Sequence, residues 1–197
     1  ASMEDVRLVK VCPSEACVEV WLRRADLELP TRWTITSGCG GGITFADLTE
    51  AARPLVSDVR VTAGQLGRLM QALQRTQETR GVHSSALATG EELLVVVEDV
   101  GRHNTIDKLL GSCLMRGIST QDRILLSTGR ISSEMLYKAA RAGIPVVVSR
   151  TSPTSLSVAL AAAWNVTLVG YVRRESLNVY HGQERVIMKE APFDAYV

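Results

Sequence analysis

An α/β fold with a largely parallel or mixed sheet flanked by helices is the fold class that this sequence predicts. From residue 93 onwards, short apolar runs of strand length alternate with segments whose apolar residues recur at helical spacing. The runs are uninterrupted, as in strands that helices cover on both faces. Gly117 and Gly143 stand where two of these helices should end. Together these observations predict right-handed crossovers between neighbouring strands.

The expected elements follow one another in βαβαβαβ order. They are strand 93–97, helix 106–114, strand 124–126, helix 133–142, strand 146–148, helix 156–164 and strand 166–169. Upstream, Thr62 and Gln65 have capping-box spacing, and the apolar residues after them predict a helix to about Arg80. Residues 89–91 predict a hairpin turn, and residues 179–183 predict a final hairpin.

The N-terminal part has a different pattern. Loose alternation over residues 11–22 predicts one strand whose partner is missing or distant, so we expect a truncated start. Glycines at 38 and 40–42 surround Cys39 and predict a loop. The expected organisation is a remnant of an N-terminal strand region, residues 1–35, followed by a core domain, residues 36–197.

Composition excludes several classes of protein. The 197 residues carry 22 Lys and Arg against 21 Asp and Glu, so bulk charge gives no reason to expect nucleic-acid binding. Neither a signal-peptide core nor an apolar run of about 20 residues is present, which predicts a cytoplasmic protein without a membrane span. Any anion site must therefore be local.

The four cysteines have no disulfide or CxxC pattern and are interpreted singly. Cys113 falls on a helical apolar stripe and is expected to be a small buried residue. Cys12 and Cys17 flank a strand and are interpreted as structural thiols. Cys39 lies in a glycine loop, where a thiol is accessible and can pass sulfur to another protein, although such loops also serve as plain turns.

Three loops that follow predicted strands resemble one another. Each places an arginine, Arg102, Arg130 or Arg150, with hydroxyl or amide side chains just before a helix. Ligands of open α/β sheets bind beyond the carboxyl ends of strands, where helix N-termini favour anions. Asn104, Ser132 and Ser152 would each serve as an N-cap, but capping does not require arginine. Three arginines at one sheet edge therefore predict a ligand with several phosphates.

The histidines allow more than one interpretation. His103 lies near Glu98 and Asp99 in the sequence and is either a general acid or base or a hydrogen-bonded loop residue. His83 invites comparison with zinc deaminases, but Ser85 replaces their glutamate and the chain lacks a CxxC pair. No metal site is predicted.

Several motifs resemble those of the FdhD family of formate dehydrogenase accessory sulfurtransferases. They are GVHSSA at 81–86, EDVGRHNTIDK at 98–108, STGRISSEM at 127–135, SRTSPT at 149–154 and LVGY at 168–171. The resemblance implies a core similar to the cytidine-deaminase fold without its zinc, and a homodimer. It also implies a carrier that takes persulfide sulfur from a cysteine desulfurase. The sulfur would pass to bis-molybdopterin guanine dinucleotide for the catalytic subunit of formate dehydrogenase.

Loops and resemblance together predict Cys39 as the carrying thiol and GDP as an analogue of the cofactor. The predicted cofactor-binding residues are His83, Ser84, Arg102, His103, Asn104, Arg130, Ser132, Arg150, Ser152, Thr154, Tyr171, Val172, Arg173, Arg174, Glu175 and Ser176.

The carrier loop departs from the family's usual Cys-x-x-Cys. Here it is Cys39-Gly40-Gly41-Gly42, with glycine in place of the second cysteine. One thiol suffices for persulfide transfer because the acceptor attacks the outer sulfur, but a relay partner is missing. An altered sequence, a one-cysteine variant and a member reduced to cofactor binding all fit. The alternatives are thus a cofactor-delivering chaperone without sulfur transfer and, third, a nucleoside deaminase.

Overall fold

The structure is a computed structural model that describes residues 3–12, 17–24, 34–35, 43–44, 53–77, 80–188 and 194–195. Its helices are α1 (Ala63–Thr76), α2 (Arg102–Arg116), α3 (Ser133–Arg141) and α4 (Ser155–Trp164), with short 3-10 turns at Met3–Asp5 and Gln183–Arg185. Its strands are β1 (Val6–Cys12), β2 (Cys17–Leu22), β3 (Thr34–Ile35), β4 (Ile43–Thr44), β5 (Val61–Thr62), β6 (His83–Ala88), β7 (Leu93–Asp99), β8 (Ile124–Ser127), β9 (Val146–Ser149), β10 (Thr167–Gly170), β11 (Ser176–His181), β12 (Val186–Ile187) and β13 (Asp194–Ala195).

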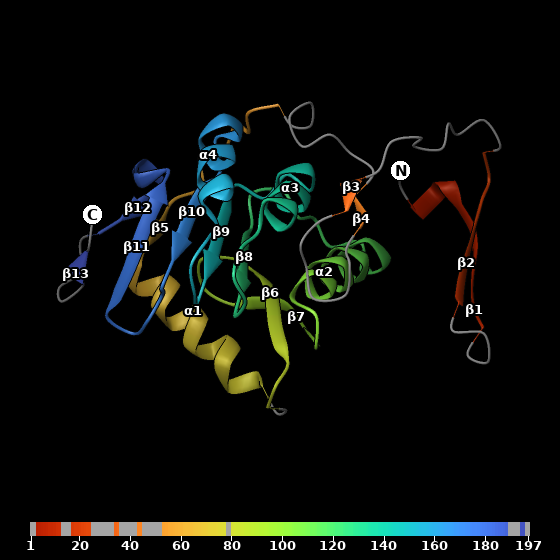
Figure 1. Ribbon diagram of the computed structural model, residues 1–197, viewed down its shortest axis with the longest axis horizontal. Coiled ribbons are helices and arrows are strands. Elements are labelled where there is room, and N and C mark those ends of the chain that lie inside the picture. Colours follow the sequence, from red (N-terminus) through yellow and green to blue (C-terminus); the bar gives the residue numbers. More distant parts are fainter. Residues whose placement is uncertain are drawn as a thin grey trace.

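A seven-stranded sheet in the order β13-β11-β10-β9-β8-β6-β7 forms the centre of the fold (Figure 1). β8, β9 and β10 are parallel, as the alternating pattern predicts. β6 lies antiparallel between β7 and β8, and β11 is antiparallel to β10. The sheet is therefore mixed rather than largely parallel, because the hairpin of β6 and β7 folds back beside β8.

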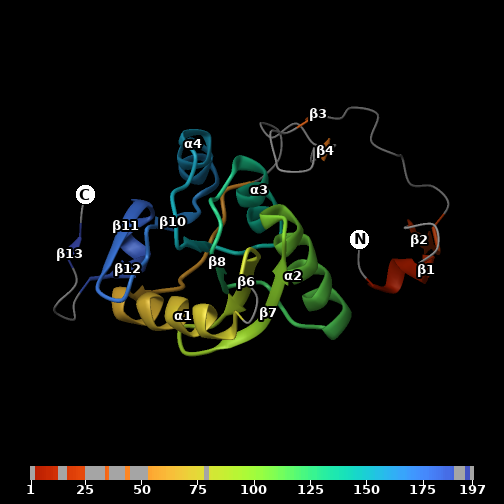
Figure 2. The same cartoon turned by 60° about the horizontal axis from the view of Figure 1, so that its bottom comes forward.

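Two apolar cores cover the two faces of this sheet. Leu125 of β8 and Val147 of β9 pack with α2, α3 and α4 on one face. Their neighbours Leu126 and Val148 pack with α1 on the other face. Because successive side chains of a strand point to opposite faces, strands buried on both sides need apolar residues at every position. The result is a three-layer arrangement in which α1 covers one face and α2, α3 and α4 cover the other (Figure 2).

Helix α1 begins where the sequence predicts. Thr62 is its N-cap and accepts a hydrogen bond from the Gln65 backbone N–H at 3.1 Å, while the Thr62 N–H donates to Gln65 Oε1 at 2.8 Å. This reciprocal pair is the capping box. The helix ends at Thr76, a little earlier than the expected Arg80.

The two ends of the chain differ from expectation. Residues 11–22 are not one strand: β1 and β2 form an antiparallel hairpin, so the partner of β2 is the segment just before it. That hairpin lies apart from the three layers (Figure 1). The predicted final hairpin at 179–183 is also absent among the described residues. Gly182, with φ of 78°, instead ends β11 and starts a 3-10 turn that leads to β12 beside β5.

Candidate anion-binding site

The arginine-bearing loops meet at one edge of the sheet. β8, β9 and β10 end there, and the antiparallel strand β6 begins there with His83, which pairs with Asp99 at the end of β7. We call the surface formed by Arg102, Arg130, Arg150 and Arg173 the arginine edge. It lies beyond the carboxyl ends of the parallel strands, the usual position of ligands in open α/β sheets.

Backbone hydrogen bonds join the loop after β8 to the loop after β9. The Ile131 N–H donates to Ser152 O at 3.3 Å, and the Thr154 N–H donates back to Ile131 O at 3.0 Å. The Arg150 N–H donates to Ser127 O at 2.9 Å. These bonds fix the relative positions of the two loops.

The turn after β10 is joined to the same structure. The Tyr171 N–H donates to Thr151 O at 3.0 Å, and Nη1 of Arg173 donates to Arg150 O. Arg173 is thereby placed beside Arg150. The two guanidinium groups come from loops that are far apart in the sequence, which is the arrangement expected for a multiply charged anion.

Buried and half-buried hydroxyl groups hold the loops in place. Ser85 Oγ lies 2.7 Å from Thr105 Oγ1, linking β6 to α2. Ser149 Oγ donates to Gly129 O at 2.8 Å, and Thr128 Oγ1 accepts from the Ser84 N–H at 2.9 Å. Buried polar groups require hydrogen-bond partners. The serines at this edge of the sheet supply or find such partners in the backbone of the loops.

Arg150 has the most informative environment of the arginine edge. Its Nη1 is buried and has no hydrogen-bond partner among the described residues. Burial, and then the positive charge of Arg173, lower the pKa of Arg150. A buried donor without an acceptor is costly, and two adjacent cations repel each other. An anion between them would remove both costs.

Three helices of this layer begin at the same edge. Ser132 Oγ caps α3 by accepting from the Met135 N–H, as predicted. α4 is capped by Thr154 rather than Ser152. α2 begins at Arg102 with Gly101 as N-cap, so the predicted cap Asn104 lies inside the first turn. The helices leave free N–H groups and the positive ends of their dipoles at the arginine edge.

Asp99 explains why α2 starts early. Its Oδ1 accepts from the Gly101 N–H at 2.8 Å and from Asn104 Nδ2 at 3.0 Å, and Lys108 lies 2.6 Å from Oδ2. The hydrogen bonds from Lys108, Gly101 and Asn104 lower the pKa of Asp99 to about 2. This carboxylate is thus a structural anion that holds the helix start.

His103 contacts α3 rather than the acidic residues next to it in sequence. Its Nε2 lies 2.8 Å from Ser132 Oγ and 3.8 Å from a carboxylate oxygen of the buried Glu134. Lys138 bridges Glu134 at 3.1 Å and Asp107 at 2.9 Å. Both close contacts use one ring nitrogen, so the group lacks the relay geometry of a serine-histidine-acid triad.

His83 and Gly129 set the position of Arg102. A Cβ on Gly129 would lie 2.9 Å from Arg102 Cβ and 3.3 Å from His83 Nδ1, so only glycine leaves room here. Burial, and then the charge of Arg102, lower the pKa of His83. The neutral form of His83 is therefore favoured beside Arg102 at the arginine edge.

The turn between β10 and β11 contributes residues with different exposures. Tyr171 is exposed and has φ of 53°, in the left-handed region that side chains disfavour. Val172 is fully buried, so its side chain belongs to the core. Arg174 and Glu175 form a highly exposed ion pair at 3.9 Å. Such a pair contributes little to stability.

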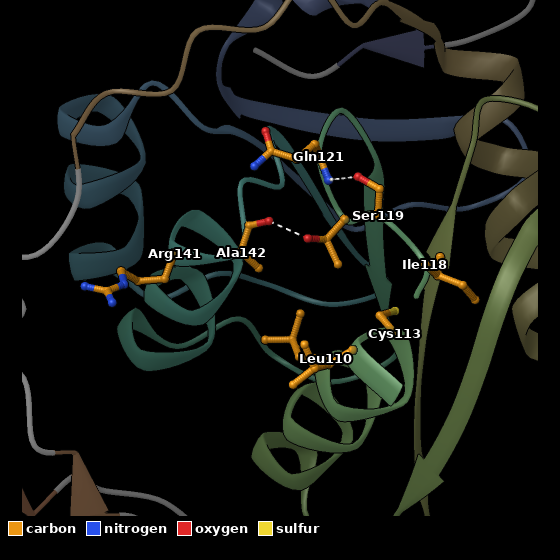
Figure 3. A pocket seen from close by; sticks show the side chains of 9 residues that line it. Leu110, Cys113, Ile118, Ser119, Gln121, Arg141 and Ala142 are labelled. Atoms are coloured by element: carbon orange, nitrogen blue, oxygen red, sulfur yellow. Dashed lines mark hydrogen bonds between the residues drawn. The ribbon is translucent and has the colours of Figure 1, made fainter. Parts of the chain in front are cut away.

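A separate cavity lies at the opposite edge, where α2 and α3 end (Figure 3). It has a volume of about 420 Å³ and is lined by Leu110, Cys113, Leu114, Ile118, Ser119, Thr120, Gln121, Arg141 and Ala142. Burial raises the pKa of the Cys113 thiol, which disfavours the thiolate. The prediction that Cys113 is a small buried residue is confirmed.

No helix in the described part of the chain is long and apolar enough to cross a membrane. Within the same ranges, no group of three or more His, Cys, Asp and Glu side chains is placed to hold a metal ion.

Comparison with known families decides the relationship. The model of the FdhD/NarQ family matches residues 1–187. The chain belongs to the FdhD/NarQ family. The resemblance seen in the motifs is thereby confirmed.

Named relatives of this FdhD/NarQ chain agree. It is 39% identical over 197 residues to "Sulfur carrier protein FdhD" of Halalkalibacterium halodurans, covering 93% of this chain and 72% of the relative. It is 40% identical over 162 residues to the protein of that name in Bacillus subtilis, covering 79% and 62%. A crystal structure of a putative formate dehydrogenase accessory protein from Desulfotalea psychrophila matches with a TM-score of 0.73 and 32% identity, over 94% of this chain and 73% of that chain. The predicted α/β class, a mixed sheet flanked by helices, is confirmed.

The FdhD/NarQ fold brings most of the predicted site residues to one edge. Arg102, Arg130, Arg150 and Arg173 lie on its connected loops, with His83, His103 and Ser132 between them. Cys39 lies outside the described residues, in the connection between the antiparallel strands β3 and β4. Its position relative to the arginine edge stays a prediction.

Sequence reasoning missed three residues that support the arginine edge. They are Thr128, which binds the Ser84 backbone; Gly129, against which Arg102 packs; and Glu134, the buried partner of His103. All three stand in the motif STGRISSEM, within two residues of the predicted Arg130 or Ser132. No periodicity marks Glu134 as buried, because its burial depends on the approach of α2 to α3.

Proposed function

We propose that this chain is a sulfur carrier that binds bis-molybdopterin guanine dinucleotide and supplies it with sulfur for formate dehydrogenase. The observation that carries the proposal is the arginine edge, above all the buried and unpartnered Nη1 of Arg150 beside Arg173. The names of the relatives support the sulfur-carrying part. The pyrophosphates of the two dinucleotide arms match the charge of the edge.

The arginine edge offers several kinds of donor to a phosphate group. Arg150 and Arg173 would bind one phosphate group as paired donors, and the first turns of α3 and α4 would add backbone N–H groups. Tyr171, exposed at the rim, offers an aromatic face on which a purine can stack. His83 and His103 would form the side of the site that lies between Arg102 and α3.

Sulfur transfer is assigned to Cys39. The Cys39 thiolate would attack the outer sulfur of a persulfide on a cysteine desulfurase, so that one S–S bond breaks, another forms, and the donor leaves as a thiolate. The acceptor then attacks the outer sulfur of the Cys39 persulfide, which restores the Cys39 thiolate. One thiol is enough for both steps, which is consistent with glycine at position 42.

Titration with GDP tests the phosphate-binding part. By calorimetry, Arg150→Ala should weaken GDP binding by roughly ten- to a hundredfold, because a hydrogen bond to a charged group contributes about 1.5–3 kcal/mol. Arg130→Ala should also weaken it. The matched control is Arg116→Ala, an exposed arginine at the opposite end of α2. Unchanged affinity in Arg150→Ala would contradict the proposal.

Intact mass tests the sulfur-carrying part. After incubation with a cysteine desulfurase and cysteine, the chain should gain one sulfur atom, and Cys39→Ser should abolish the gain. Cys113→Ser is the control that should retain it, because Cys113 is buried with a raised pKa. Absence of an adduct on Cys39 would overturn the carrier role.

The alternative is a chaperone that binds and delivers the cofactor without transferring sulfur. Gly42, in place of the second cysteine of the family's loop, favours it. Both proposals use the arginine edge, and only the mass experiment distinguishes them. GDP binding without any sulfur adduct would select the chaperone.

The proposed partners are a cysteine desulfurase and the catalytic subunit of formate dehydrogenase, and we also propose a homodimer. Light scattering of the purified chain would give the oligomeric state. Co-purification of the dehydrogenase subunit with wild type, compared with Cys39→Ser, would show whether the partner requires the thiol. A monomer at micromolar concentration would contradict the dimer.

A further inference from the structure

Cys12 and Cys17 lie opposite each other in the N-terminal hairpin. β1 and β2 pair in antiparallel register, and the pair nearest their connection is Cys12 with Cys17. Both cysteines are half-buried, whereas the residues between them and the base of the hairpin are mostly exposed. Four residues, 13–16, join the two strands. The function proposed for Cys39 does not involve this pair.

Their register places the two thiols within reach of each other. Residues directly opposite in antiparallel strands have Cα atoms about 4.5 or about 5.5 Å apart, depending on their hydrogen bonding. A disulfide requires a Cα separation of about 4.4–6.8 Å. Either kind of pair meets this requirement, and opposed side chains lie on the same face of the ribbon. Both residues are thiols in this structure.

We propose that Cys12 and Cys17 are a redox-active dithiol that closes reversibly into a disulfide with a small-molecule disulfide as oxidant. One thiolate attacks the oxidant, its S–S bond breaks, and one thiol of the oxidant leaves. The second thiolate then attacks the mixed disulfide and releases the other thiol. The protein dithiol is oxidised by two electrons, and one small disulfide is reduced to two thiols.

The short connection predicts a labile disulfide. Loop-closure stabilisation grows with the number of residues enclosed, and here only four lie between the cysteines. The disulfide should therefore be easily reduced, as expected of a reversible site rather than a structural crosslink. Cys113 is unsuited to the same reaction because it is buried on α2.

Equilibration of the full chain with mixtures of reduced and oxidised glutathione tests the proposal. After alkylation and trypsin digestion, both cysteines fall in the single peptide Val11–Arg23, which follows Lys10. As the oxidised fraction rises, this peptide should carry no alkyl group and should be two hydrogen atoms lighter than its dithiol form. Cleavage after Glu15 should then give two fragments that separate only on reduction.

Two comparisons make the outcome decisive. Cys12→Ser should leave Cys17 alkylated or joined to glutathione, with no internal link. Denaturation in urea should lower the effective concentration of the two thiols at least roughly tenfold, because the native register holds them together. Three outcomes would each overturn the proposal. Both cysteines could be alkylated at every glutathione ratio, a disulfide could link one of them to Cys39, or the unfolded chain could be oxidised as readily as the folded chain.

Discussion

Tyr171 shows what one residue contributes at the arginine edge. Its φ of 53° is in the left-handed region, which costs a residue with a side chain about 1–2 kcal/mol. The turn nevertheless holds it there through the hydrogen bond from its N–H to Thr151 O. Strained residues cluster at functional sites, and we therefore propose that Tyr171 contacts the ligand.

Substitution of Tyr171 separates strain from binding. Tyr171→Gly and Tyr171→Ala both remove the ring and should weaken GDP binding alike. Urea denaturation should find the glycine variant more stable than the alanine variant by about 1 kcal/mol, because glycine adopts positive φ without cost. At a position with negative φ, the glycine variant would instead be the less stable of the two variants. An alanine variant at least as stable would contradict the account.

The two histidines predict how stability depends on pH. Burial lowers the pKa of both His83 and His103 below the usual 6.5. As pH falls, the unfolded chain therefore takes up protons before the folded chain does. Stability should be constant above about pH 6.5 and should decrease as pH falls from there through the folded pKa values.

Urea denaturation across this pH range checks the prediction. The double variant His83→Gln and His103→Gln should show a smaller decrease than wild type below about pH 6.5. Adding GDP should reduce the decrease in wild type, since protonated histidines favour a bound anion. Equal slopes for wild type and the double variant would show that other groups cause the acid sensitivity.

At the scale of the element, the start of α2 is positioned by close packing against the loop after β8. A Cβ on Gly129 would lie 2.9 Å from Arg102 Cβ, which is closer than side-chain atoms normally approach. Arg102 and the first turn of α2 would have to move. Because α2 also carries His103, the movement would also shift the contact between His103 and Ser132 at the start of α3.

Two glycine substitutions test this packing. Gly129→Ala should lower the free energy of unfolding by about 1–3 kcal/mol, as expected for overpacking, and should weaken GDP binding. Gly111→Ala is the matched control inside α2, because a Cβ there meets no atom within 4 Å. It should stabilise the protein by about 0.5–1 kcal/mol without changing affinity. Urea denaturation and calorimetry measure both; a neutral Gly129→Ala would contradict the packing argument.

At the scale of the whole molecule, Arg185 joins segments from both ends of the core. It is 6% exposed and donates to Ser57 O, Asn165 Oδ1 and Thr167 Oγ1 at 3.2–3.4 Å. These partners come from the segment before α1, the end of α4 and β10. The adjacent Glu184 balances its charge at 3.2 Å.

Removal of this arginine should destabilise the fold without altering the site. Arg185→Met keeps most of the volume but leaves Asn165 and Thr167 without their donor. We expect a loss of about 2–4 kcal/mol in urea denaturation, since unsatisfied buried polar groups each cost about 1–3 kcal/mol. GDP affinity of the folded variant should be unchanged. A loss below about 1 kcal/mol would show that the contacts are dispensable.

Much of the fold was determined by local sequence. The buried strands and the helices after residue 93 follow from apolar periodicity, and the start of α1 follows from Thr62 and Gln65. The meeting of Arg102, Arg130 and Arg150 at one edge was also predictable, because parallel strands place their carboxyl ends together. These features depend on residues that are close in the chain or on a rule of topology.

Tertiary structure alone decided the rest. β6 lies between β7 and β8, Arg173 lies beside Arg150, Glu134 is buried under His103, and Cys12 opposes Cys17. Each of these pairings depends on which surfaces bury one another or on which register a strand adopts. Spacing within one segment does not encode either choice, since burial free energy is set by partners distant in sequence.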